Sequence, residues 1–191
     1  MNLILASESP RRKELMERMG LSFRIVTAEH DETMDPALPP EQEVARVSRC
    51  KAEAVAPLCQ PEDLIVAADT IVVCAGRVMG KPRDAADAKQ MLRLLSGREH
   101  QVMTGLTVWQ GGCATTRTVV TRLRFRALAE AEIDAYVATG EPMGKAGSYA
   151  VQGLGSMLVE GLEGDYYNVM GLPVCTLALL LRQHGVKLLG I

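Results

Sequence analysis

The sequence is poor in aromatic residues, net charge and paired cysteines, and each shortage excludes a class of protein. Aromatic side chains make up 4% of the 191 residues, too few for the base-stacking platforms of proteins that bind single-stranded nucleic acid. The 21 basic and 23 acidic residues leave a formal net charge of −2, which argues against a nucleic acid polymer as partner. The five cysteines form no Cys-x-x-Cys pair, a pattern typical of reduced thiols in a cytoplasmic protein.

Long apolar segments and the common nucleotide-binding and hydrolase motifs are also missing. The longest strongly apolar stretch, 169–181, is interrupted by Gly171 and Pro173 and is shorter than the roughly 18 residues of a membrane-spanning helix. We therefore expect no membrane association. The chain has no Gly-x-x-x-x-Gly-Lys-Ser/Thr loop, no Gly-x-Gly-x-x-Gly fingerprint and no Gly-x-Ser-x-Gly elbow, so the signatures of three large enzyme classes are absent.

The remaining composition predicts one α/β domain over residues 1–191. Hydrophobic residues are 48% and charged residues 23% of the chain, close to the averages for globular domains. Strand-like and helix-like segments alternate without repeats, which predicts a mixed central sheet flanked by helices. The first half is richer in helices and the second in hairpins, which indicates two lobes around one sheet.

The expected elements follow apolar periodicity and the positions of glycine and proline. The expected strands are 3–6, 23–27, 64–68, 70–74, 102–109 and 116–125, followed by a hairpin of 157–159 and 166–169. The expected helices are 10–19, 41–56, 84–95, 129–138 and 173–184.

Three cations, Arg11, Arg12 and Lys13, occupy the first turn of the first expected helix. The helix dipole favours anions at this end, and each misplaced exposed charge costs about 0.3–1 kcal/mol. A bound anion would remove the conflict, because backbone N–H groups, the hydroxyls of Ser7 and Ser9 and the guanidinium groups together suit a phosphate. The alternative is a solvated helix start whose arginines pair with nearby glutamates.

Lys51 and Asp69 each interrupt an apolar pattern. Lys51 lies within the valine stripe of the helix at 41–56, so it either extends along the helix to water or points into a functional site. Asp69 interrupts the apolar run 64–73, where an unpaired carboxylate would be costly. It either accepts a hydrogen bond from the next turn, binds a metal or acts as a base.

Two further lysines lie on glycine loops beside strand-like segments. They are Lys81, in Gly80-Lys81-Pro82, and Lys145, in Lys145-Ala146-Gly147. Glycine lets backbone amides approach an anion closely. Each loop taken alone also fits an ordinary turn.

Several motifs occur in a fixed order along nearly the whole chain. They are Leu5-Ala6-Ser7-x-Ser9-Pro10-Arg11-Arg12, Ala68-Asp69-Thr70-Ile71-Val72, Gly80-Lys81-Pro82, Leu95-Ser96-Gly97-Arg98, Glu141-Pro142-Met143, Lys145-Ala146-Gly147-x-Tyr149, Gln152-Gly153 and Asp165-Tyr166-Tyr167-Asn168-Val169-Met170-Gly171-Leu172-Pro173. In this order they resemble the motifs of the Maf family of nucleoside triphosphate pyrophosphatases.

The resemblance implies a Maf/inosine-triphosphatase-like fold, with a mixed sheet and an active-site cleft between two lobes. It implies cleavage of a nucleoside triphosphate to the monophosphate and pyrophosphate with Mg²⁺ or Mn²⁺, and it is compatible with a homodimer. The Lys-Ala-Gly-x-Tyr and Gln-Gly motifs resemble those of the dTTP/UTP branch rather than the 7-methyl-GTP branch. Gly144 stands where that branch usually carries Asp.

The resemblance also implies roles for individual residues. The family's general base matches Asp69, and an acidic residue in the loop after the second strand, Glu32, joins Asp69 as an expected metal ligand. The family's specificity positions match Arg11, Thr70 and Gln152. The full expected substrate-binding set is Ser7, Ser9, Arg11, Arg12, Lys51, Thr70, Lys81, Lys145 and Gln152.

A triphosphate needs cations and usually a divalent metal to balance its charge. We expect Asp69 to accept a proton from the attacking water while the metal and the cations neutralise charge developing on the phosphates. The alternative is that Asp69 is primarily a metal ligand. The alternatives for the whole protein are a nucleotide-binding regulator of cell division with little hydrolysis, and a phosphomonoesterase.

Overall fold

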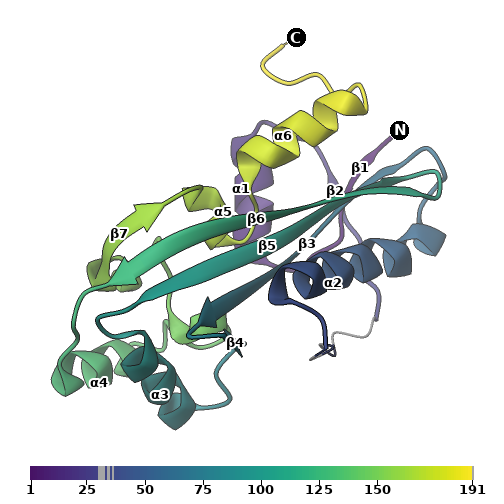
Figure 1. The fold of residues 1–191 in the computed structure, drawn as a ribbon. Coiled ribbons are helices and arrows are strands. Elements are labelled where there is room, and N and C mark those ends of the chain that lie inside the picture. The colour runs from purple at the N-terminus through teal and green to yellow at the C-terminus, as the bar shows by residue number, and fades with distance from the viewer. Residues whose placement is uncertain (30–32, 34, 36, 191) are drawn as a thin grey trace. The chain divides into compact units, whose positions relative to one another are not determined.

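The computed structural model describes residues 1–29, 33, 35 and 37–190 and contains one seven-stranded sheet (Figure 1). The strand order is β2-β1-β3-β5-β6-β7, with β4 paired to β3. Strand β1 runs parallel to β2 and to β3, whereas the β3–β4 and β6–β7 pairs are antiparallel. This mixture of pairings, with helices packed against the sheet, confirms the mixed α/β class expected from the sequence.

The elements have the following bounds. The strands are β1 (Leu3–Leu5), β2 (Arg24–Ile25), β3 (Leu64–Cys74), β4 (Arg77–Met79), β5 (Glu99–Gln110), β6 (Cys113–Phe125) and β7 (Val159–Glu163). The α-helices are α1 (Pro10–Arg18), α2 (Pro40–Val55), α3 (Ala85–Leu95), α4 (Glu130–Ala138), α5 (Tyr166–Met170) and α6 (Val174–Gln183). Short 3-10 helices lie at Ala56–Leu58, Ala146–Ser148 and Leu154–Leu158. Within the described ranges no helix has the length and apolar character needed to cross a bilayer.

The chain forms two compact units. The first unit contains Met1–Asp69, Thr104–Val119 and Gly171–Ile191, and the second contains Thr70–Met103 and Val120–Met170. Strands β3, β5 and β6 contribute residues to both. The boundary within β3 separates Asp69 from Thr70, so two neighbouring candidate site residues belong to different units.

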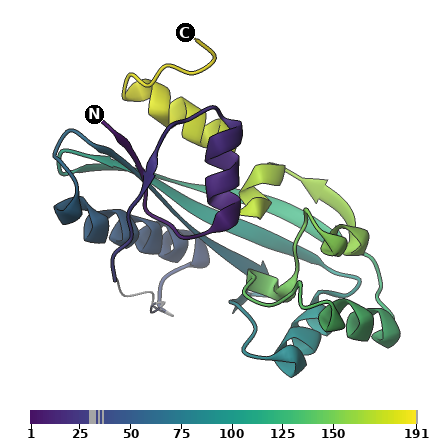
Figure 2. The ribbon, with the colours of Figure 1, turned by 180° about the vertical axis from the view of Figure 1, so that it is seen from behind.

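In the first unit, helices cover both faces of the sheet. Ile4 and Ile65 pack in one buried cluster with Ala52 and Val55 of α2. Helices α1 and α6 lie on the opposite face from α2 (Figures 1 and 2). Strand residues buried on two sides explain why β1 and the first half of β3 are continuous apolar runs.

In the second unit, helices α3 and α4 lie side by side (Figure 2). Lys89 of α3 forms an ion pair of 2.6 Å with Asp134 of α4, and Arg93 forms one of 2.7 Å with Glu130. These pairs are largely exposed, so each contributes at most about 1 kcal/mol, and the buried faces of the helices hold the unit together.

Two elements differ from the sequence-based expectation. Strand β3 runs without a break from Leu64 to Cys74, although the sequence predicted two strands separated at Asp69. Its pairing therefore continues through the polar position, and Asp69 lies within the strand instead of at its end.

The second difference is at 166–170, which is helix α5 and not the second strand of a hairpin. Asp165 Oδ1 accepts hydrogen bonds from the backbone N–H groups of Tyr167 and Asn168 at 2.8 and 3.2 Å. A side chain that accepts from the first free N–H groups favours a helix start. The other strand expected for this hairpin, 157–159, is wrong as well: Leu154–Leu158 is a 3-10 helix, and β7 begins at Val159 and pairs with β6.

Candidate functional site

The loop between β1 and α1 is held by Ser7 and Arg12. Ser7 is buried, and its hydroxyl oxygen accepts hydrogen bonds from the N–H of Ser9 at 3.2 Å and from Arg12 Nη1 at 3.1 Å. Arg12 Nε donates to the Gly171 carbonyl oxygen at 2.8 Å. These contacts join the start of α1 to the segment that leads into α6. Arg12 therefore has a structural role in addition to any contact with a ligand.

Arg11 differs from its neighbour. It is half-buried, and it forms no hydrogen bond or ion pair with the residues that the structure describes. Burial lowers the pKa of its guanidinium group. The first turn of α1 also contains no acidic residue. Arg11 is therefore a partly desolvated cation at a helix N-terminus, and no carboxylate of that turn balances its charge. An anionic ligand would relieve both costs.

Lys51 and Asp69 form a close ion pair. Lys51 Nζ lies 2.6 Å from Asp69 Oδ1, and the side chains are 11% and 21% exposed. The lysine that interrupts the apolar stripe of α2 thus points to the carboxylate that interrupts the apolar run of β3. Asp69 Oδ2 accepts no hydrogen bond from any described residue. The pair leaves one carboxylate oxygen available at a position that is mostly shielded from water.

The position of α2, and with it Lys51, depends on a close approach to β5 that the sequence did not reveal. A Cβ atom at Gly105 would lie 2.2 Å from the carbonyl oxygen of Val44. One turn further along the helix, the hydroxyl groups of Ser48 and Thr107 share a hydrogen bond of 2.8 Å, and both residues are fully buried. The absence of a side chain at 105 and this hydroxyl pair fix where α2 sits on the sheet.

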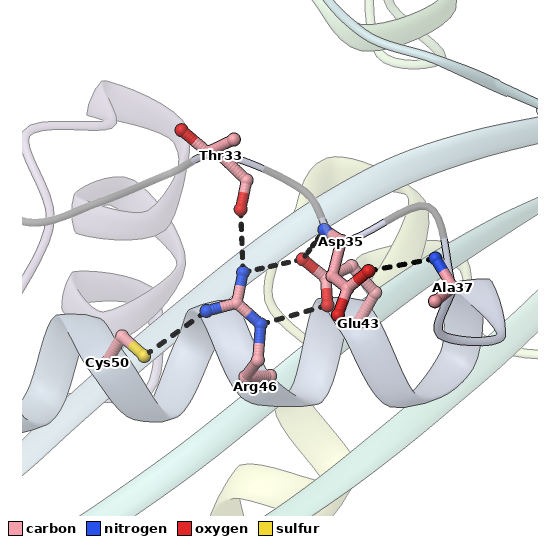
Figure 3. Close-up of polar contacts among 6 residues, drawn as sticks. All are labelled: Thr33, Asp35, Ala37, Glu43, Arg46 and Cys50. Atoms are coloured by element: carbon pink, nitrogen blue, oxygen red, sulfur yellow. Dashed lines mark hydrogen bonds and ion pairs between the residues drawn. The ribbon is translucent and has the colours of Figure 1, made fainter.

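The loop before α2 is tied to the helix by a buried glutamate and an arginine (Figure 3). Glu43 is 1% exposed, and its Oε1 accepts a hydrogen bond from the N–H of Asp35 at 2.9 Å. Arg46 Nη2 lies 2.6 Å from the same oxygen and donates to the Thr33 carbonyl at 2.7 Å. Thr33 and Asp35, described residues of the segment after β2, are thus held by α2. Glu32, expected from the sequence to be a metal ligand, lies outside the described residues.

The two lysine loops of the second unit contact each other. The N–H of Gly147 donates to the Gly80 carbonyl oxygen at 3.1 Å. Gly147 has a φ of +69°, and a Cβ there would lie 2.9 Å from Val72, so this position requires glycine twice over. Lys81 is exposed and makes no ion pair with the described residues, whereas Lys145 Nζ donates to the carbonyl oxygen of Glu141. The structure therefore brings the loops of both candidate lysines together.

Thr70 and Gln152 are the other candidates in the second unit. Thr70 is half-buried and follows Asp69 in β3. Because successive strand residues point to opposite faces of a sheet, Thr70 does not share the contact of Asp69 with Lys51. Gln152 is exposed, and its side chain makes no hydrogen bond with the described residues. Its amide is available to a ligand.

Tyr149, from the Lys-Ala-Gly-x-Tyr motif, belongs to the core of the second unit. Its hydroxyl shares a hydrogen bond of 2.8 Å with His100 Nε2, and its ring lies edge-on to Phe125 with centroids 4.9 Å apart. Burial raises the pKa of Tyr149 and lowers the pKa of His100 to about 4. This motif position is structural, and the sequence offered no signal for the contact with His100.

No three His, Cys, Asp or Glu side chains gather into a metal-binding group among residues 1–29, 33, 35 and 37–190. Among the candidate residues that the structure describes, Asp69 is a carboxylate that could hold a metal, through its available Oδ2. Mg²⁺ that also binds phosphate groups is commonly held by only one or two carboxylates of a protein, so this carboxylate fits a metal whose other ligands are phosphate oxygens.

Nearly the whole chain is similar to proteins of one family. A family profile described as "Maf-like protein" matches residues 2–184. A protein of Anaeromyxobacter dehalogenans (strain 2CP-1 / ATCC BAA-258) named "dTTP/UTP pyrophosphatase" is 49% identical over 190 residues, covering 97% of this chain and 95% of that protein. A protein of the same name from Moorella thermoacetica (strain ATCC 39073 / JCM 9320) is 49% identical over 193 residues, covering 98% and 97%. A solved structure of the Staphylococcus aureus Ham1 protein aligns with a TM-score of 0.46 at 12% identity over 65% of this chain and 72% of that one, a likeness too weak to support an inference.

Proposed function

Because this chain belongs to the Maf family, we propose that it hydrolyses dTTP and UTP to the nucleoside monophosphate and pyrophosphate. The observation that carries the proposal is the ion pair of Lys51 and Asp69, 2.6 Å long and mostly shielded from water in the middle of an apolar strand. Relatives 49% identical over nearly their full length bear the name of this activity.

The triphosphate is bound in the first unit by the start of α1. Arg11 supplies a cation that the protein does not neutralise with a described residue, and the free N–H groups of the helix start add hydrogen-bond donors. Ser7 and Arg12 hold this loop in shape, with Ser9 beside them. Lys51 adds a further positive charge close to Asp69.

Asp69 accepts the proton of the attacking water. The water oxygen bonds to the α-phosphorus, the bond from that phosphorus to the bridging oxygen breaks, and pyrophosphate leaves with the electron pair. The water proton passes to Asp69 Oδ2, the oxygen that no described residue occupies. Lys51 holds the other oxygen and so orients the carboxylate, because positioning contributes much of the rate in phosphoryl chemistry.

A divalent cation, Mg²⁺ or Mn²⁺, is part of the proposal. Glu32, expected from the sequence to be a metal ligand, would hold it together with the substrate phosphates while Asp69 Oδ2 takes the proton. In the alternative, in which Asp69 is primarily a metal ligand, the cation would take that oxygen instead. When bound, such a cation neutralises charge that develops on the phosphate oxygens. The remaining charge is balanced by the side chains of Arg11 and Lys51.

The base is selected by the second unit. Thr70 and the exposed amide of Gln152 offer both donors and acceptors to the edge of a pyrimidine, and a site built on such hydrogen bonds rejects a wrong base strongly. Lys81 and Lys145, on loops that contact each other, add positive charge for the phosphates. A homodimer and a cytoplasmic location stay predictions.

Product analysis tests this function. The protein is incubated with Mg²⁺ and each of dTTP, UTP, dCTP, dATP, dGTP and dTMP, and pyrophosphate and orthophosphate are measured separately. We expect pyrophosphate and the monophosphate, with dTTP and UTP cleaved fastest. Release of orthophosphate from dTMP, or tight nucleotide binding without any product, would contradict the proposal.

A further inference from the structure

Three hydrogen-bond donors of the second unit, one side chain and two backbone N–H groups, bind the carboxylate of Glu141. Its Oε1 accepts hydrogen bonds from the Tyr136 hydroxyl at 2.8 Å and from the N–H of Gly155 at 2.9 Å, and its Oε2 accepts from the N–H of Leu154 at 2.9 Å. The Tyr136 oxygen in turn accepts from the N–H of Ala150 at 3.1 Å. Glu141 and Tyr136 therefore hold residues 150–155, which we call the Gln152 loop, at both of its ends.

The backbone of the Gln152 loop runs in direct contact with this carboxylate. A Cβ atom at Gly153 would lie 2.3 Å from Glu141 Oε2, and one at Gly155 would lie 2.7 Å from the Tyr136 hydroxyl. Both positions are glycine for lack of space. The glycine of the Gln152-Gly153 motif is therefore explained in part by the Glu141 carboxylate packed against it.

Electrostatics supports a fixed, ionised carboxylate. Burial alone would raise the pKa of Glu141, but the N–H groups of Gly155 and Leu154 and the Tyr136 hydroxyl hold the pKa below its usual value. Hydrogen bonds to a charged group are stronger than those between neutral groups. The loop is consequently tied by charge-assisted bonds, and its geometry changes little while Glu141 remains ionised.

Gln152, in the middle of this loop, differs from the two residues before it. Ala150 and Val151 are buried, whereas Gln152 is exposed and its amide makes no hydrogen bond with the described residues. The carbonyl oxygen of Glu141 also accepts a hydrogen bond from Lys145. Glu141 thus holds the backbone on which Gln152 lies and also the side chain of Lys145.

We infer that Glu141 is a positioning residue for base selectivity: it contacts no substrate, but it fixes where Gln152 presents its amide to the pyrimidine. The inference rests on the proposed function. It extends that function because it assigns selectivity to Glu141, a half-buried residue beneath the loop, as well as to the residues that meet the base. Without the anchor, the loop samples several positions and the amide no longer discriminates between bases.

The test compares kcat and KM of Glu141→Gln for dTTP, dCTP and dATP, with pyrophosphate release as the readout. The glutamine places an NH₂ group against a backbone N–H, so the loop loses at least one bond. We expect the preference for dTTP to fall about tenfold or more, because small displacements of a positioned group have effects of this size or larger. The change should appear mainly in KM for dTTP, with kcat largely kept. Tyr136→Phe keeps the Glu141 carboxylate but removes the two hydrogen bonds of the Tyr136 hydroxyl, to Glu141 and from the N–H of Ala150. It should change the preference in the same direction if Glu141→Gln folds poorly.

Glu132→Gln is the matched control. Glu132 lies in α4, the helix that carries Tyr136, and its carboxylate also accepts from a backbone N–H, that of Ala129 at 3.0 Å, and from Arg126 at 2.6 Å. The Glu132→Gln variant should be less stable than the wild type and should show the same base preference. In the background of Gln152→Ala, Glu141→Gln should leave the base preference unchanged, because a residue that acts through Gln152 has no effect once Gln152 is gone.

Hydrogen exchange at the amides of Leu154 and Gly155 separates the possible failures. Faster exchange in Glu141→Gln together with a reduced dTTP preference supports the inference. Faster exchange with an unchanged preference overturns it while the proposed function stands, and so does a lost preference that persists in the Gln152→Ala background. If the wild-type protein releases no pyrophosphate from any nucleotide, the proposed function fails and the assignment of selectivity fails with it.

Discussion

The two units hold their candidate residues in different ways. In the first unit the contacts join charged side chains to groups distant in the sequence: Arg12 reaches Gly171, 159 residues away, and Lys51 reaches Asp69 on another element. In the second unit, Gln152 and Lys145 are carried by glycine-containing loops anchored through backbone groups around Glu141. Under the proposed function, side-chain charge in the first unit would perform the reaction and backbone position in the second would select the base.

Among the substitutions that test this difference between the units, the removal of Lys51 should lower the turnover of dTTP strongly. In Lys51→Met, Asp69 loses the partner at 2.6 Å that orients it, and the phosphates lose a cation. We expect turnover of dTTP to fall about 100-fold, the usual effect of deleting one electrostatic contact to a transition state. The measurement is steady-state pyrophosphate release, and the preference among bases should not change.

Lys13→Met is the control for this charge change. Lys13 forms a pair of 3.7 Å with Glu17, and both side chains are about half exposed, so its removal should alter turnover little. Equal losses in both variants would mean that net charge matters rather than the ion pair, and the assignment of Lys51 would be wrong.

Gly105→Ala tests whether the reaction depends on how α2 is seated. The new Cβ would lie 2.2 Å from the Val44 carbonyl oxygen, so α2 must shift, and we expect a loss of about 3 kcal/mol in the free energy of unfolding. Turnover should fall because Lys51 moves with the helix. Urea denaturation and pyrophosphate release measure the two effects.

The matched variant is Gly161→Ala, in β7 of the second unit, where a Cβ would meet nothing within 4 Å. It should change stability by less than about 0.5 kcal/mol. A tolerated alanine at 105, with normal turnover, would show that the close approach of α2 to β5 is not required.

His100 gives the second unit a dependence of stability on pH. Burial lowers its pKa from 6.5 to about 4, so the unfolded chain binds a proton at a higher pH than the folded protein does. The free energy of unfolding therefore falls as the pH drops from about 6.5 to about 4, by up to about 3 kcal/mol from this group. Urea denaturation at pH 7 and at pH 4.5 should show a smaller loss in His100→Gln than in the wild type.

Tyr149→Phe sharpens this comparison. It removes the hydrogen bond of 2.8 Å to His100 but keeps the imidazole, so stability should be lower at both pH values while the loss on acidification persists. Parallel losses in the wild type and in His100→Gln would refute a buried neutral histidine.

Local features of the fold could be predicted from the sequence. Pro10 at a helix start and Gly20 at its end, with a φ of +73°, act through their own backbone preferences. The interruptions at Lys51 and Asp69 were also visible, since periodicity alone exposes a charge in an apolar stripe. Their pairing was not predictable, because it depends on how α2 crosses β3.

The rest depended on contacts that short stretches of sequence do not encode. Glu141 belongs to a recognisable motif, but two of the three donors that bind its carboxylate are backbone N–H groups thirteen and fourteen residues away, and a backbone donor leaves no side-chain signal in the sequence. Helix α5 was mistaken for a strand because five residues are too few to distinguish a period of two from one of 3.6. Asp165 just before it was the available signal for a helix start.

The turnover number of Asp69→Asn at saturating dTTP tests the central claim most directly. Asparagine keeps the shape and can still accept a hydrogen bond from Lys51, but it cannot take the proton of the attacking water. With the fold confirmed by circular dichroism, we predict that pyrophosphate release slows by about 100-fold to 10,000-fold, the range for loss of a general base. A turnover number within about tenfold of the wild type would lie below that range and would contradict the role given to Asp69.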